Sequence, residues 1–264
     1  MQRRRCSAYR RRKEPGRPLM LLRRSATGMM IAAVGVLAFG YAPSSALAAE
    51  AYPVDSVAVT SIDAPTADSD ESVYPDYNAA VNVTSQYWAT HFSEFVPGTY
   101  VPPNLYSGNE ELGIGLYDAP AETVYCGSFV LTDQNAWYCL PEDFIAFDID
   151  LMDRALTVGD AFIYFIVAHE WGHAIQARVA PAQRDLRIEL QADCLAGAAL
   201  QGMANDGTLA FEEGDNEELT VGIASLGDPW PWANPTDHGS ADERLGQFNR
   251  GAQFGVADCL QPTY

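Results

Sequence analysis

The chain has almost no basic residues beyond its first fifty. Ten of the sixteen Lys and Arg residues lie before residue 50, and from Glu50 onward six arginines stand against 34 acidic residues. The formal net charge of that part is therefore 6 − 34 = −28. Such an acidic surface repels phosphate backbones, which argues against nucleic acid as a partner and favours solubility or a cation-rich medium.

The chain also lacks an apolar run long enough to span a membrane. Its apolar run from about Met29 to Ala42 is shorter than the roughly 20 residues that a membrane-spanning helix needs. The run follows arginines and precedes the small residues "ALAA" at 46–49, a pattern typical of a secretory signal peptide. We therefore predict that residues 1–49 are a signal peptide and that the protein is secreted or in the cell envelope. Contact with a membrane is expected only if this segment stays uncleaved.

Cysteine is scarce, with five residues in all, and Cys6 lies in the segment that export would remove. The four others, Cys126, Cys139, Cys194 and Cys259, contain no C-x2-C spacing, which argues against a zinc site built from four cysteines. In an exported protein an even set predicts two disulfides, with three possible connectivities. We favour Cys126–Cys139, which closes a short loop, and Cys194–Cys259, which would tie the end of the chain to a helix.

The composition divides the chain after its N-terminal segment into a linker and one domain. Residues 50–75 are rich in Asp, Ser, Pro and Ala without a helical period, so we interpret them as an acidic, flexible linker. Residues 76–264 contain no internal repeat and are interpreted as a single domain. The apolar spacing there predicts helices at about 76–95, 158–179, 182–205, 212–226 and 242–251, and a strand at about 144–150. The fold class is therefore α+β, mainly helical with a small β-sheet.

Two of the only four histidines lie four residues apart in "IVAHEWGHAIQ", residues 166–176. Residues four apart share one face of a helix, so His169 and His173 can point at one metal ion, and neutral imidazoles suit Zn²⁺. Glu170 can reach a water held on that metal, as the base of an H-E-x-x-H site does. The alternative is a metal-free buried helix. That alternative would bury a glutamate and two histidines without partners, at a substantial desolvation cost.

A catalytic zinc site typically has a third protein ligand and one open position. Ala180-Pro181 ends the first helix about six residues, or roughly 9 Å, past His173. A second helix that folds back from about 181–184 returns to the level of the metal near Glu189, in "RIELQADCLAG". Asp193 shares the face of Glu189 and can accept the free ring N–H of a ligating histidine. We therefore predict that Glu189 completes the zinc site and that Asp193 supports it.

The segment "DHGSADER", residues 237–244, carries two further candidates. His238 is our candidate donor to the oxyanion that develops during peptide hydrolysis. The alternative is a place in the N-terminal cap of the last helix, for which "DHGS" is equally suited. We expect Arg244 to bury its guanidinium against a carboxylate rather than to contact substrate. The strand near 145–150 is our candidate edge for an extended peptide.

The sequence resembles the bacterial neutral zinc metallopeptidase family, relatives of the gluzincins, in three motifs that occur in the same order. These motifs are "AHEWGHAIQ", "ELQADCLAG" and "HGSADER" with the Phe, Gly and Cys that follow it. The resemblance covers almost all of residues 76–264, and its first two motifs are specific. It also supports pairing Cys194 with Cys259. The sequence departs from the family pattern in two places: the stretch between the first two motifs is short, and Glu243 stands where Gln is expected. The resemblance implies a zincin-type fold with His169, His173 and Glu189 as zinc ligands and Glu170 as catalytic base.

The expected function is zinc-dependent hydrolysis of peptide bonds in a peptide or protein substrate. Zn²⁺ lowers the pKa of its bound water towards 7 and polarises the scissile carbonyl, while Glu170 passes the water's proton to the leaving amine. Two alternatives stay open. One is an exported binding or scaffold protein that holds zinc only for stability, and the other is a zinc hydrolase that acts on other bonds.

Overall fold

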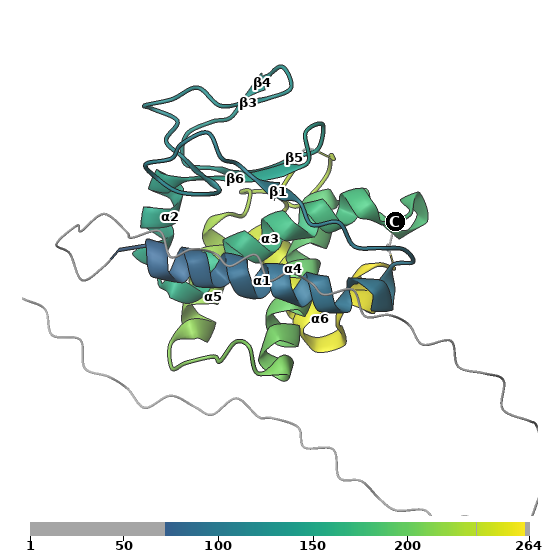
Figure 1. The fold of residues 1–264 in the computed structure, drawn as a ribbon. Helices are drawn as coiled ribbons and strands as arrows, with labels where there is room; N and C mark the ends of the chain where they lie inside the picture. The colour runs from purple at the N-terminus through teal and green to yellow at the C-terminus, as the bar shows by residue number, and fades with distance from the viewer. Residues whose placement is uncertain (1–71, 236, 262–264) are drawn as a thin grey trace, which may run out of the picture. The chain divides into compact units, whose positions relative to one another are not determined.

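The computed structural model describes residues 72–235 and 237–261, so the predicted signal peptide and most of the predicted linker lie outside the described residues. A small sheet lies on one side of a group of packed helices (Figure 1). The helices are α1 (Tyr74–Phe95), α2 (Ile149–Leu156), α3 (Asp160–Arg178), α4 (Ile188–Asp206), α5 (Asp215–Ser225), α6 (Ala241–Phe254) and α7 (Val256–Cys259). The strands are β1 (Asn104–Leu105), β2 (Leu116–Tyr117), β3 (Tyr125–Cys126), β4 (Phe129–Val130), β5 (Ala136–Cys139) and β6 (Phe144–Asp148). The prediction of a mainly helical α+β fold is confirmed.

Strand β6 is the central strand of the sheet. β1 and β2 pair with one of its edges in parallel, and β5 pairs with the other edge in the antiparallel sense. All five residues of β6 are buried, and it has partners on both sides, so it cannot receive a substrate strand. Our expectation of a peptide-binding edge at 145–150 was therefore wrong. The outer strand on the antiparallel side is β5.

The predicted strand also ends earlier than expected, because a helix that the alternating pattern concealed begins inside it. The side chain of Asp148 accepts a hydrogen bond from the backbone N–H of Asp150 and so caps the N-terminus of α2. A carboxylate at this position satisfies a backbone donor that the helix leaves free. The last two residues of "IAFDID" therefore belong to α2 rather than to the strand.

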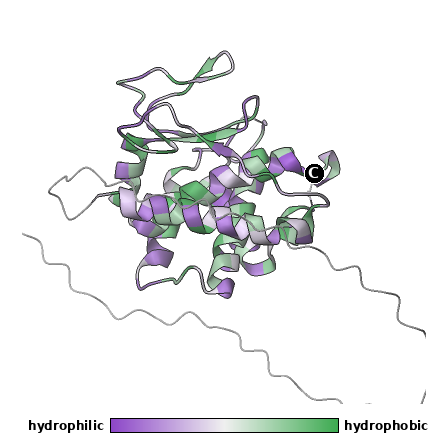
Figure 2. Ribbon diagram, in the orientation of Figure 1, coloured by the Kyte–Doolittle hydropathy of each residue, from purple (hydrophilic) through white to green (hydrophobic). Residues whose placement is uncertain are grey.

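Helix α3 lies at the centre of the helical group and contacts α1, α4, α5 and β5. Because neighbours surround it, buried residues occur on all its faces, among them Phe165, Trp171 and Ile175. Figure 2 shows hydrophilic and hydrophobic residues interspersed along α1, as expected for a helix with one exposed and one buried face. None of the helices in the described part of the chain has the length and apolar character of a membrane span.

Helices α4 and α6 cross with their backbones in contact, which fixes the end of the chain. A Cβ atom on Gly251 would lie 1.8 Å from the carbonyl oxygen of Cys194, so only glycine fits there. Beside this crossing the structure forms the Cys194–Cys259 disulfide, which holds α7 on α4. The structure also forms Cys126–Cys139, which links β3 to β5. Both pairings are the ones that we favoured from the sequence.

The largest difference from the predicted helices lies between α3 and α4. Pro181–Gln183 form a short 3-10 helix, residues 184–187 are not helical, and α4 begins only at Ile188. The predicted helix at 182–205 therefore began about six residues too early. The chain makes its return through a turn rather than a continuous helix, and Glu189 lies in the first turn of α4.

Candidate metal centre

Three ligand-type atoms meet where α3 passes the first turn of α4. The Nε2 atoms of His169 and His173 lie 3.2 Å apart, and Oε2 of Glu189 is 3.2 Å from the first and 3.5 Å from the second. A tetrahedral ion with ligands at 2.0–2.1 Å keeps those ligand atoms roughly 3.4 Å from one another. The triangle therefore has the size that a small tetrahedral ion requires.

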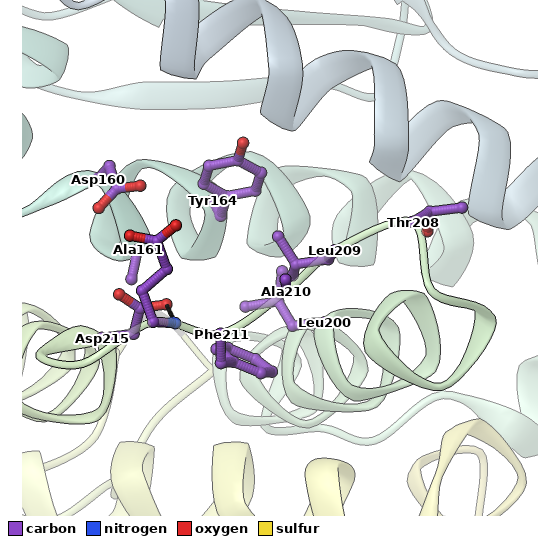
Figure 3. Close-up of a pocket in the computed structure, with 10 residues that line it drawn as sticks. Asp160, Ala161, Tyr164, Leu200, Thr208, Leu209, Ala210, Phe211 and Asp215 are labelled. Atoms are coloured by element: carbon purple, nitrogen blue, oxygen red, sulfur yellow. Dashed lines mark hydrogen bonds between the residues drawn. The ribbon is translucent and has the colours of Figure 1, made fainter.

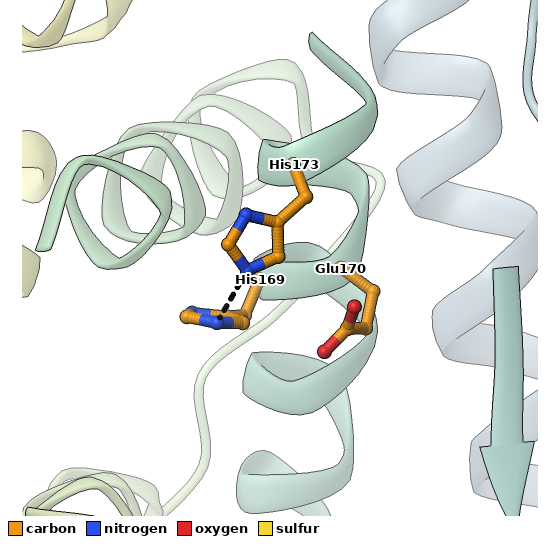
Figure 4. A group of neighbouring side chains, drawn as sticks. All are labelled: His169, Glu170 and His173. Atoms are coloured by element: carbon orange, nitrogen blue, oxygen red, sulfur yellow. Dashed lines mark hydrogen bonds between the residues drawn. The ribbon is translucent and has the colours of Figure 1, made fainter. Parts of the chain in front are cut away.

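The regular geometry of α3 places the two imidazoles on one face of the helix. The four-residue spacing stacks His169 and His173, with ring centroids 4.8 Å apart and ring planes nearly perpendicular (Figure 4). Gly172 lies between them in sequence, and a Cβ there would be 3.0 Å from the carbonyl oxygen of Ala192 on α4. The absence of a side chain lets the two helices approach closely, which brings Glu189 to the histidines.

The Nδ1 atom of His169 is occupied by Asp193, which leaves Nε2 facing the triangle. Oδ1 of Asp193 is 2.9 Å from Nδ1, and Arg244 donates to both oxygens of the same carboxylate at 2.8 and 2.9 Å. Although burial alone would raise the pKa of Asp193, the Arg244 guanidinium and His169 hold it below its usual value. An ionised carboxylate can only accept, so the hydrogen must be on Nδ1 of His169.

The Nδ1 atom of His173 is occupied in the same way by an amide. Oε1 of Gln176 lies 2.9 Å from it, and the amide nitrogen of Gln176 donates to the carbonyl of Ile188 at 2.7 Å. Since the nitrogen of the amide is engaged with a carbonyl, its oxygen must face His173 and accept the Nδ1 hydrogen. Both histidines thus direct the lone pair of Nε2 at the same point.

This donor set fits a divalent cation. Two imidazole lone pairs and a carboxylate within 3.5 Å of one another repel unless a positive charge lies between them. Burial lowers the pKa of His173, but the Glu189 carboxylate outweighs that effect and raises it to about 10. Burial likewise raises the pKa of Glu189, yet the two imidazoles hold it well below its usual range, so it stays ionised. The triangle thus attracts a positive charge, and a divalent ion there would take the place of the proton on His173. Two neutral imidazoles and one carboxylate are then the ligands that zinc prefers.

Glu170 lies next to this triangle, with a carboxylate oxygen within 4.8 Å of a ring nitrogen of each histidine. Its side chain comes from the turn of α3 between the two histidines and its carboxylate lies to one side of their rings (Figure 4). It is 6% exposed, and among the described residues no group donates a hydrogen bond to it. Burial raises its pKa, while the two imidazoles offset part of that shift. A buried carboxylate with free lone pairs and a raised pKa is suited to accept a proton.

Apart from Arg244, which binds Asp193, the residues of the "HGSADER" segment lie away from the three ligand-type atoms. The ring of His238 is 53% exposed and faces Asp228 at 3.7 Å, and the backbone N–H of His238 donates to the same carboxylate. Ser240 is the N-cap of α6, and Glu243 completes a capping box with it. The carboxylate of Glu243 also accepts from the backbone N–H of Trp232. For His238 an oxyanion role stays a prediction.

Arg244 is buried against a carboxylate, and that prediction is confirmed. Sequence reasoning missed Gln176 and Gln191, two buried amides that hydrogen bond each other beside His173. The signal that could have found them is a polar amide at a buried position within each of the two motif helices. Such groups need partners when buried.

A pocket of about 210 Å³ lies away from the histidines, at the N-terminal end of α3 (Figure 3). Its lining combines apolar side chains, such as Leu209 and Phe211, with the carboxylates of Asp160, Glu212 and Asp215. Nearby, Glu218 accepts a hydrogen bond from the backbone of Ala161 in the first turn of α3, and Asp215 accepts one from the backbone of Glu212. These carboxylates satisfy free backbone donors. The donor set suited to zinc begins near the middle of the same helix, at His169 and His173.

The family described as "Putative neutral zinc metallopeptidase" matches residues 1–261. The chain belongs to this family. Members of the neutral zinc metallopeptidase family are thus expected to carry zinc, and the donor set described above fits that ion.

Comparison with individual proteins gives two relatives. The chain is 28% identical over 220 residues to the "Uncharacterized protein YpfJ" of Escherichia coli strain K12, which is 71% of this chain and 72% of that one. The same identity and coverage hold for the protein of that name in Escherichia coli O6:H1, strain CFT073. No solved structure matches the chain significantly. The relatives support the family but name no substrate.

Proposed function

We propose that the protein is an exported zinc metallopeptidase that hydrolyses peptide bonds. In this proposal His169, His173 and Glu189 hold the zinc ion, Glu170 is the general base and Asp193 orients His169. The observation that carries the proposal is the triangle of three lone-pair atoms, 3.2 to 3.5 Å apart, beside a buried carboxylate to which no residue of the described part of the chain donates. Membership of a zinc metallopeptidase family supports the same metal and reaction class.

Each protein group has a defined task in such a reaction. Bound in the triangle, Zn²⁺ would supply a Lewis acid that polarises the scissile carbonyl and acidifies the attacking water. A carboxylate oxygen of Glu170 accepts the proton of that water and then donates it to the leaving amine. The raised pKa of Glu170 favours both transfers, because a stronger base accepts the proton more readily and still remains acidic enough to protonate an amine.

Strand β5 is the candidate platform for an extended substrate. It packs against α3, and no other strand of the described residues pairs with its outer edge. Arg178 of α3 forms an ion pair with Asp143, and both side chains contact the hydroxyl of Tyr138 on β5, which fixes the strand to the helix. An extended peptide could add its backbone hydrogen bonds to such an edge. This assignment replaces the edge that we expected at 145–150.

The two disulfides support export. Disulfides form and persist in oxidising compartments, and the described domain contains Cys126–Cys139 and Cys194–Cys259. The segment that we interpret as a signal peptide, residues 1–49, lies outside the described residues. N-terminal sequencing of the protein recovered from the medium or periplasm tests this part of the proposal, with a start near residue 50 as the expected result.

The proposal is tested by measuring metal content and peptidase activity together. The purified protein should contain about one zinc per chain, lose casein hydrolysis on chelation and regain it on addition of zinc. The melting temperature of the same samples, with and without zinc, distinguishes a peptidase from a scaffold protein that binds zinc only for stability. A chain that loses stability on chelation but hydrolyses no peptide at any stage would contradict the peptidase assignment.

A further inference from the structure

We propose that Gln176 and Gln191 form an amide relay that positions His173 for zinc and connects it to the C-terminal segment at Cys259. This inference rests on the proposed zinc site and adds two positioning residues to it. Both side chains are buried, with 7% and 4% exposure, although neither would contact the ion or the substrate.

The relay starts from backbone carbonyls that fix the orientation of Gln191. Its amide nitrogen donates to the carbonyls of Gln183 at 2.7 Å and Cys259 at 3.0 Å, so both amide hydrogens are used. Its Oε1 accepts from the backbone N–H of Asp185 at 3.0 Å and from the amide of Gln176 at 3.1 Å. Rotating the amide by half a turn would place donors against donors and acceptors against acceptors, so one orientation is strongly preferred.

The orientation of Gln191 then determines that of Gln176. Oε1 of Gln191 and the carbonyl of Ile188 both face the side chain of Gln176, and both need a donor. The amide nitrogen of Gln176 must lie on that side, which leaves its Oε1 towards Nδ1 of His173 at 2.9 Å. The hydrogen of His173 is thereby kept on Nδ1 and the lone pair on Nε2, as a metal ligand requires.

The far end of the relay depends on the C-terminal disulfide. Cys259 belongs to the short helix α7, which the Cys194–Cys259 bond holds on α4, and its carbonyl is one of the two that fix Gln191. His169 is positioned differently, by the charged pair of Asp193 and Arg244. A neutral relay behind His173 orients the ring without adding another buried charge to the site, which would carry a large desolvation cost.

The test is the zinc affinity of the full chain, measured by competition with a fluorescent zinc chelator. Gln176→Leu and Gln191→Leu should each weaken zinc binding by about 10- to 100-fold, the range typical of groups behind a metal-binding histidine. The double variant should be little weaker than the more affected single one, because both changes break the same chain. Gln201→Leu, a matched change on the solvent side of α4, should leave zinc affinity unchanged.

A second variant distinguishes positioning from a general contribution to packing. Gln176→Glu keeps an acceptor for the Nδ1 hydrogen of His173 but loses the two donors, so it should bind zinc at least as tightly as the wild type while its metal-free melting temperature falls. If the relay only packs the helices, Gln176→Leu and Gln176→Glu lower the melting temperature and leave zinc affinity unchanged, and the inference is overturned.

The link to the C-terminus has its own measurement. Replacing Cys194 and Cys259 by alanine, with Cys126–Cys139 intact, should weaken zinc binding in the otherwise wild-type chain and have no further effect in Gln191→Leu, in which the connection to Cys259 is already broken. An equal loss in both proteins would overturn the link. A wild-type chain that binds no zinc at all would contradict the proposed function, whereas zinc binding that no relay variant changes would contradict this inference alone.

Discussion

The carboxylate of Asp193 accepts the Nδ1 hydrogen of His169 across 2.9 Å, and both side chains are buried. The same carboxylate is held by two hydrogen bonds from Arg244, which is itself 2% exposed. Burial lowers the pKa of Arg244, but Asp193 outweighs that effect and raises it. The negative charge on Asp193 therefore interacts with both His169 and Arg244, so removing that charge affects both residues.

Asp193→Asn tests this dual role. The variant keeps the size of the side chain but leaves the Arg244 charge without its buried partner, so the free energy of unfolding should fall by about 3–5 kcal/mol. Zinc affinity should fall by about 10- to 100-fold, because His169 loses the group that fixes its tautomer. Chemical denaturation and chelator competition measure the two effects. Asp153→Asn, at an exposed position of α2, is the control that should change neither.

Glu170→Gln separates metal binding from catalysis. The amide cannot accept the proton of the attacking water, so peptide hydrolysis should fall by at least about 10²-fold. Zinc content, measured by elemental analysis, should stay at that of the wild type, because in our proposal Glu170 is the general base and is not one of the three ligands. Undiminished turnover by this variant would remove Glu170 from the mechanism.

Glu189→Ala tests the third ligand. Removing the carboxylate takes away one of three donors and the only formal negative charge in the triangle, so bound zinc should fall well below one per chain. Glu217→Ala, at an exposed position of α5, is a control of the same chemistry and should retain its zinc. Full occupancy of the Glu189→Ala variant would reject this residue as a ligand.

The two disulfides should contribute unequally to stability. Cys194–Cys259 closes a loop with a sequence separation of 65, against 13 for Cys126–Cys139. Because a cross-link restricts the unfolded chain more when the loop is longer, replacing the first pair by alanines should cost about 4 kcal/mol and replacing the second about 3. Urea unfolding of the two variants, each with the other bond intact, gives the comparison. The opposite ranking would show that native packing outweighs loop closure.

His91 should stabilise the fold in a pH-dependent way. Its ring lies 2.8 Å from both Glu94 and Asp206, so it joins α1 to the end of α4. Burial lowers its pKa, but the two carboxylates outweigh this and raise it. The interaction of protonated His91 with the two carboxylates stabilises the folded state. This stabilisation is complete below the pKa of histidine in the unfolded chain, about 6.5, and is lost as pH rises through the higher pKa of His91 in the folded chain.

The variant His91→Gln can still donate a hydrogen bond to a neighbouring carboxylate but cannot carry the charge. The difference in free energy of unfolding between wild type and variant should therefore be larger at about pH 5.5 than at about pH 9, by up to about 1 kcal/mol for a pair this exposed. Urea denaturation at the two pH values measures it. A difference that does not change with pH would show that the ring contributes through packing alone.

Much of the candidate site follows from local spacing, and the rest depends on contacts between distant segments. His169 and His173 face one point because four residues make about one helical turn, which the sequence displays directly. The position of Glu189 was reached by counting a return path, and the structure places its carboxylate beside the two histidines although α4 begins at Ile188 rather than near 182. Its role as a ligand stays a prediction. The position of Glu189 depends on where along α3 the returning chain passes the histidines, and not on whether the connection is helical.

The parts that could not be predicted involve partners without a sequence signature. Helix α2 was concealed because "IAFDID" alternates like a strand, while the Asp148 cap that begins the helix depends on its local conformation. The amide of Gln191 meets a carbonyl 68 residues away, at Cys259. Every residue has such a carbonyl, so no pattern distinguishes this one before the chain is folded.

The contact at Gly172 also sets how far apart the candidate ligands stand. A methyl group there would meet the backbone of Ala192 at 3.0–3.1 Å, so α3 and α4 would have to separate by a few tenths of an ångström. Since the imidazoles belong to one helix and Glu189 to the other, that separation would lengthen the distances between the carboxylate and the rings beyond the roughly 3.4 Å that suits a tetrahedral zinc ion. The size of the cage is thus held by a main-chain contact that involves none of the three donor atoms.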